Sequence, residues 1–99
     1  MSGIDLENIT LYEVAKEYGE ENLIGDFRRP MWQRFATIAL SSMMKNPKLR
    51  PYAFQLSNMV KLNSINGELL SIIIEDMEGM NTNNDEKAAL KILAAIRNI

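Results

Sequence analysis

The side chains of this chain that could do chemistry are mainly carboxylates. Histidine and cysteine are both absent, so the commonest general base and the commonest metal ligands are missing. Glu75, Asp76 and Glu78 lie close together and could in principle share acid–base work. Their spacing predicts an outward helix face, where water surrounds all three carboxylates. We therefore expect a protein without catalytic residues, without a cofactor and without a metal.

One short motif resembles half of a calcium-binding loop. Asn81, Asn83 and Asp85 occupy alternate positions, as the first ligands of such a loop do. The loop then requires a glycine, where this chain has Glu86, and a glutamate at its twelfth position, where this chain has Ile92. Helix capping by asparagine is the better interpretation of this segment.

The charges of the chain are strongly segregated. Residues 27–67 contain no Asp or Glu but seven basic residues, whereas residues 1–26 hold seven acids against one lysine. Residues 68–99 hold six acids against three bases, so a formal net charge of −2 conceals a basic middle between acidic ends. Such a pattern either neutralises itself within the fold or presents a field to a partner.

The basic middle of the chain supplies the candidate partner-binding residues. We expect a larger protein with an acidic surface to contact the following seven residues: Arg28, Arg29, Trp32, Arg34, Lys45, Lys48 and Arg50. The alternative interpretation places Trp32 and Phe35 in the core. It pairs the arginines with acids of neighbouring helices, namely Glu13, Glu17, Glu75 and Glu78.

The elements that must position these residues are all helices. Thr10 with Glu13 and Asn83 with Glu86 match the capping-box pattern, and Gly19 provides a left-handed stop. Apolar periodicity between such signals predicts five short helices, at roughly 10–18, 30–45, 51–62, 67–79 and 84–98. The fold class is therefore all-α, a compact bundle forming a single helical domain over residues 1–99, with residues 1–9 as a flexible N-terminal segment.

Two apolar side chains do not fit the inward stripes of their helices. Met44 and Ile72 fall outside the main apolar faces, and in an exposed position they would form a patch for a partner or for a second copy. The alternative is a wide buried face in a small bundle.

These features predict a non-enzymatic regulatory or adaptor protein that acts by protein–protein contact, as an inhibitor, accessory factor or small subunit of a larger assembly. The first alternative is sequence-tolerant nucleic-acid binding through the basic segment 28–61. The second is binding of a small anionic ligand such as a nucleotide. A homo-oligomer is compatible with all three. With no secretory signal and no apolar run long enough to span a bilayer, we expect a cytoplasmic protein without a membrane partner.

Overall fold

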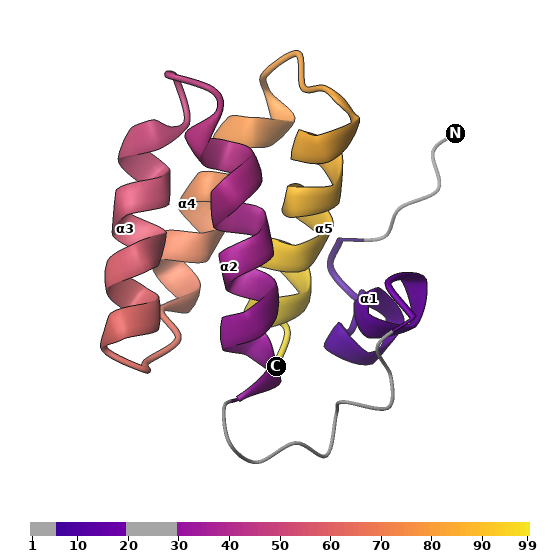
Figure 1. Ribbon diagram of the computed structural model, residues 1–99. Coiled ribbons are helices and arrows are strands. Elements are labelled where there is room, and N and C mark those ends of the chain that lie inside the picture. Colours follow the sequence, from indigo (N-terminus) through magenta and orange to yellow (C-terminus); the bar gives the residue numbers. More distant parts are fainter. Residues whose placement is uncertain (1–5, 20–29) are drawn as a thin grey trace.

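The computed structural model describes residues 6–19 and 30–99, and over these residues the chain forms five α-helices and no strand. The helices are α1 (Leu11–Glu17), α2 (Met31–Met44), α3 (Arg50–Lys61), α4 (Gly67–Glu78) and α5 (Asn84–Arg97). Helices α2 to α5 run alternately up and down, and α1 lies beside α5 (Figure 1). The expected all-α bundle is confirmed, with observed helix ends within one or two residues of the predicted ones.

Local signals in the sequence explain where the helices begin and end. Both capping boxes are present, with the amide of Glu13 donating to the Thr10 hydroxyl and the amide of Glu86 donating to the Asn83 side chain. Gly19 follows α1 with a φ of +69°, a conformation that glycine adopts without steric cost. The sequence predicts that the second helix begins at Pro30. In the structure it begins one residue later, and Pro30 is its N-cap.

The core lies mainly between α2 and α5, which form the central pair of the bundle. Their largest fully buried side chains are Phe35, Met43, Ile92, Leu93 and Ile96. Trp32 is also part of this core, with 8% of its surface exposed. This placement agrees with the interpretation of Trp32 and Phe35 as packing residues.

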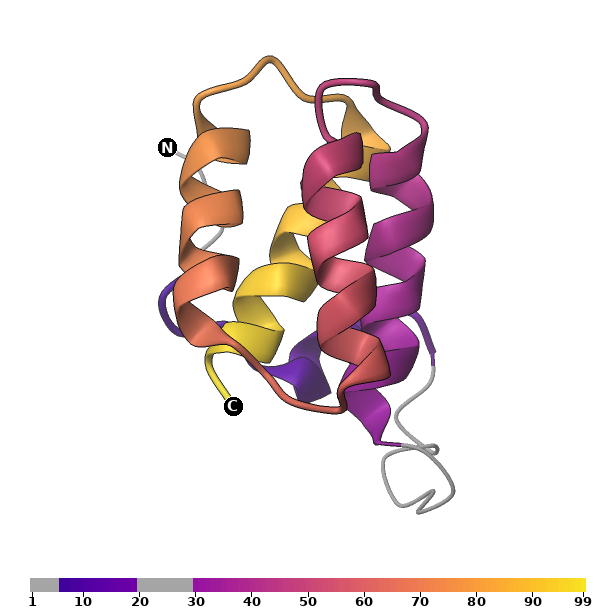
Figure 2. The same cartoon turned by 90° about the vertical axis from the view of Figure 1, so that its left-hand side faces the viewer.

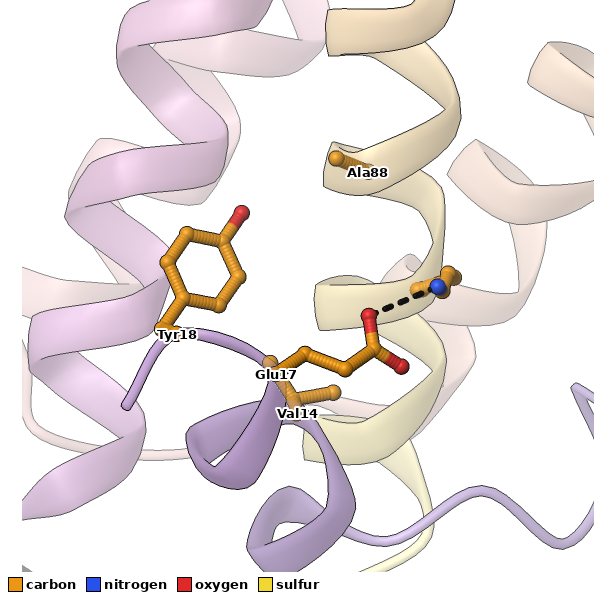
Figure 3. A pocket seen from close by; sticks show the side chains of 5 residues that line it. Val14, Glu17, Tyr18 and Ala88 are labelled. Carbon is orange, nitrogen blue, oxygen red and sulfur yellow. Dashed lines mark hydrogen bonds and ion pairs between the residues drawn. The ribbon is translucent and has the colours of Figure 1, made fainter. Parts of the chain in front are cut away.

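Helix α1 is attached to the bundle by one ion pair and by contacts of its flanking residues. The Lys91 ammonium lies 2.8 Å from the Glu17 carboxylate, and the Tyr18 ring meets the Phe35 ring edge-on at a centroid distance of 5.5 Å. Glu17, Tyr18 and Lys91 also line a hollow of about 210 Å³ between α1 and α5. Figure 3 shows this hollow, with the ion pair drawn as a dashed line. The arrangement holds a seven-residue helix that is too short to be stable alone.

The end of α5 holds the residues that precede α1. The side chains of Arg97 and Asn98 donate hydrogen bonds to the carbonyl of Leu6 at 2.9 and 3.0 Å, and Asn98 also donates to the carbonyl of Ile9. Ile9 is buried. Residues 6–9, which the sequence assigns to a flexible segment, therefore have defined contacts with α5, while residues 1–5 lie outside the described residues.

Candidate partner-binding surface

The turn between α2 and α3 carries three exposed cations. We call residues 45–50 the α2–α3 tip; it contains Lys45, Lys48 and Arg50, all with exposed side chains. The tip lies at the same end of the bundle as the connection between α4 and α5 (Figure 1). Three like charges within six residues form the densest basic cluster of the described chain.

Short-range contacts give the tip a defined shape. The Asn46 side-chain oxygen accepts a hydrogen bond from the Lys48 amide at 2.9 Å, and the Arg50 side chain donates through Nε to the Met44 carbonyl at 2.9 Å. Leu49 is fully buried between these polar residues. One apolar anchor and two local hydrogen bonds therefore hold the backbone that presents the cations.

A buried carboxylate connects the tip to α5. The Glu86 side chain is 5% exposed, and its Oε2 accepts a hydrogen bond from the Asn46 side-chain amide at 2.9 Å. Its Oε1 accepts from the Asn83 amide at 3.0 Å, within the capping box that begins α5. Both carboxylate oxygens thus have donors, which compensates for the burial of a charged group. Glu86 therefore connects the α2–α3 tip to the first turn of α5.

No carboxylate of the described residues lies within ion-pair distance of Lys45, Lys48 or Arg50. Two of the acids considered as internal partners are engaged elsewhere, since Glu17 pairs with Lys91 and Glu13 caps α1 through Thr10. The tip cations are therefore not neutralised by direct ion pairs within the described part of the chain.

The five predicted contact residues that the structure describes do not form one continuous surface. Lys45, Lys48 and Arg50 come together at the tip, whereas Arg34 lies near the beginning of α2, about 16 Å away along the helix axis at 1.5 Å per residue. The half-buried Arg34 also has an interaction partner of its own. Trp32 is buried in the core and offers little surface to a partner.

The other two predicted contact residues, Arg28 and Arg29, lie outside the described residues. Along α2, Thr37, Ser41 and Lys45 are all exposed and form one stripe that ends at the tip. Among the described residues, the part of the predicted interface that is exposed and lies together is therefore Lys45, Lys48 and Arg50, at the tip.

A hollow of about 420 Å³ lies beside the tip. It is lined by residues of the α2–α3 and α4–α5 connections: Asn46, Lys48, Gly79, Met80 and Asn81. Sequence reasoning missed these neighbours of Lys48, because the two connections are more than thirty residues apart in the chain and only the packing of the helices brings them to the same end of the bundle. The acids Glu78 and Asp85 are exposed on the α4–α5 side, so the basic character belongs to the α2–α3 side of this end.

Searches for other kinds of site give negative findings. The described ranges 6–19 and 30–99 contain no group of three or more acidic, histidine or cysteine side chains placed to hold a metal ion. None of the helices in those ranges has the length and apolar character needed to cross a membrane. Comparisons of the chain with protein-family models, curated proteins and solved structures find no match.

Proposed function

We propose that this protein is a non-enzymatic regulatory or adaptor protein that binds the acidic surface of a larger protein through the α2–α3 tip. The observation that carries the proposal is the exposure of Lys45, Lys48 and Arg50 on one short turn, without a carboxylate of the described residues in ion-pair distance. Charges held in this way act on a partner at long range and accelerate association.

The construction of the tip supports a role in recognition. A flexible basic loop would lose conformational entropy on binding, whereas Leu49 and the Asn46–Glu86 hydrogen bond already hold this turn in place. The cations therefore form a preorganised group on a rigid bundle, and less binding energy is spent on ordering them.

Binding to defined anionic polymers tests this proposal. The wild type and the variant Lys45→Glu/Lys48→Glu are titrated with fluorescent polyglutamate and with a short single-stranded oligonucleotide at low salt. Arg50 stays unchanged in this variant, since its Nε caps the Met44 carbonyl at the end of α2. The matched control Lys16→Glu/Lys61→Glu makes the same change in net charge on α1 and at the far end of α3.

We expect polyglutamate to bind the wild type and the control, and to bind the tip variant at least about tenfold more weakly. Equal affinity of the tip variant and the control would exclude the tip. Preferential binding of the oligonucleotide, with the logarithm of its binding constant falling linearly with the logarithm of salt concentration, would favour the nucleic-acid alternative. If neither polymer is retained at low salt, both proposals fail.

The hollow beside Lys48 favours a second candidate function, the binding of a small anionic ligand such as a nucleotide. Its volume of about 420 Å³ falls in the range of small-molecule sites, and Asn46 and Lys48 supply hydrogen-bond donors. A thermal-shift series with nucleotides tests this, because a ligand raises the unfolding temperature by mass action. A shift that persists in Lys48→Met, or no shift with any nucleotide, would rule out this site.

A further inference from the structure

A second surface of the bundle, distinct from the tip, combines exposed apolar side chains with opposite charges. Phe54 and Ile72 are 59% and 52% exposed, and Leu62, directly after α3, is 76% exposed. We call the side of the bundle formed by α3 and α4 the α3–α4 face; Figure 2 turns it toward the viewer. A hollow of about 320 Å³ lies on this face, lined by Gln55, Asn58, Met59, Leu62, Ser64, Asn66 and Leu69.

The contacts of α4 place Ile72 on this face. Leu69, three residues earlier, lines the hollow, and Asp76, four residues later, accepts a hydrogen bond from the Tyr52 hydroxyl of α3. Residues at these spacings lie on one side of a helix, so Ile72 lies on the side of α4 that borders α3. The exposed position that the sequence suggested for Ile72 is thus the observed one.

The contacts of α3 place its apolar residues along the opposite border. Leu62 lines the hollow itself, and Phe54 stands one turn from Asn58, which also lines it. Apolar side chains therefore flank the hollow on both helices, and exposed apolar groups gathered in this way mark interaction sites.

The two helices of the face carry charges of opposite sign. The charged residues of α3 are Arg50 and Lys61, both basic. Those of α4 are all acidic: Glu68, Glu75, Asp76 and Glu78. A partner surface of one sign would be attracted by one helix and repelled by the other, so the complementary surface must itself have a basic helix beside an acidic one.

We propose that the α3–α4 face binds a second copy of this chain, in a dimer whose two-fold axis runs parallel to α3 and α4. This axis places α3 of each copy against α4 of the other, so that basic and acidic helices meet twice. A two-fold axis across the helices would place α3 on α3 and α4 on α4, with like charges opposed. A two-fold dimer is also the commonest symmetric assembly of soluble proteins.

The register of α3 and α4 identifies the contacts in this dimer. The two helices are antiparallel, and the Tyr52–Asp76 hydrogen bond sets their relative height. Lys61 ends α3 at the level where α4 begins, so Lys61 of one copy faces Glu68 of the other. Ile72 lies level with the middle of α3, so it packs between Phe54 and Asn58 of the other copy. The result is an apolar centre with charged pairs at its edge, as in protein interfaces generally.

The size of the face predicts a weak, concentration-dependent dimer. Each helix has 12 residues and is about 18 Å long, so the face extends over about three turns of each helix. Such a face is smaller than the roughly 800 Å² that each partner buries in a standard stable interface. The dimer therefore exchanges with monomer, and the mass measured in solution depends on protein concentration.

Sedimentation velocity over a concentration series tests the dimer. The monomer mass is 11.3 kDa, and we expect the wild-type mass to rise toward twice that value as the concentration increases. Ile72→Glu should remain monomeric at concentrations where the wild type is mostly dimeric. Tyr12→Glu is the matched control, because Tyr12 is 55% exposed but lies on α1; it should dimerise as the wild type does. Circular dichroism verifies that both variants are folded.

Charge reversal tests the direction of the axis. Lys61→Glu and Glu68→Lys should each weaken the dimer about tenfold, because each brings like charges together at two symmetric positions. An equimolar mixture of the two variants should recover the wild-type affinity, since a heterodimer has opposite charges at both positions. A wild type that stays monomeric, an Ile72→Glu variant that dimerises normally, or a mixture without recovery would each overturn the proposal.

Discussion

The hydrogen bond between Asn46 and Glu86 should stabilise the fold more than its local surroundings suggest. It joins residues forty positions apart, and the Glu86 carboxylate that accepts it is 5% exposed. In Asn46→Ala, Glu86 Oε2 loses its donor inside the protein, and an unsatisfied buried group of this kind costs about 1–3 kcal/mol. Glu86→Ala removes this bond and half of the capping box, so we expect a loss of about 2–4 kcal/mol in the free energy of unfolding.

The chain contains its own control for this prediction. Glu13 has the same role in the capping box of α1, but its box is exposed, and among the described residues its side chain bonds only to Thr10. Glu13→Ala should therefore cost only about 0.5–1 kcal/mol, the usual value for a lost capping contact. The difference in free energy of unfolding between Glu86→Ala and Glu13→Ala measures the combined effect of burial and of the long-range hydrogen bond.

Urea unfolding of the wild type, both single variants and the double variant Asn46→Ala/Glu86→Ala gives the coupling energy directly. Trp32 is the single tryptophan and is buried, so its fluorescence reports loss of the core, and circular dichroism should follow the same transition if unfolding is two-state. We expect a coupling of about 1.5–3 kcal/mol, in the range of hydrogen bonds to charged groups. A coupling near zero, or equal costs for Glu86→Ala and Glu13→Ala, would refute the reasoning.

Two further predictions concern the core and the turns. Phe35→Ala removes a fully buried ring and should lower the free energy of unfolding by about 3–5 kcal/mol, whereas Phe54→Ala, at a site 59% exposed, should change it by less than about 1 kcal/mol in urea titrations. Gly19→Ala forces a side chain into a φ of +69° and should lower the unfolding temperature, with a cost of about 1 kcal/mol. In contrast, Gly79→Ala should be nearly neutral, because a Cβ there meets the Asp76 and Glu75 carbonyls at ordinary distances of 3.6 and 3.9 Å.

Much of the fold can be predicted from the sequence because the signals that define it are local. The capping boxes at Thr10 and Asn83 and the left-handed turn at Gly19 each involve residues within four positions of one another. The inward stripes of the helices follow in the same way from apolar spacing, as the buried residues Leu70, Ile73, Ile74 and Met77 of α4 illustrate. Ile99 shows the limit of such spacing: it continues the apolar stripe of α5, but it follows the last helical turn and is 71% exposed.

The candidate sites depend on packing between helices, which local spacing does not encode. The sequence identifies Lys45, Lys48 and Arg50 as basic, but it does not show that no carboxylate of the described residues comes within ion-pair distance of them. The burial of Trp32 likewise depends on which side of α2 faces α5.

The amino-acid sequence by itself thus determined the helices, their ends and the segregation of charge, because these properties arise within a few residues of chain. Only the tertiary structure decided which cations gather at the tip, that Glu86 holds the tip to α5, and that an acidic α4 lies beside a basic α3. Those arrangements arise when the apolar faces of helices distant in the sequence are buried against one another. The hydrophobic effect that drives this burial has no preferred direction, so the position of each helix depends on the apolar faces of all the others.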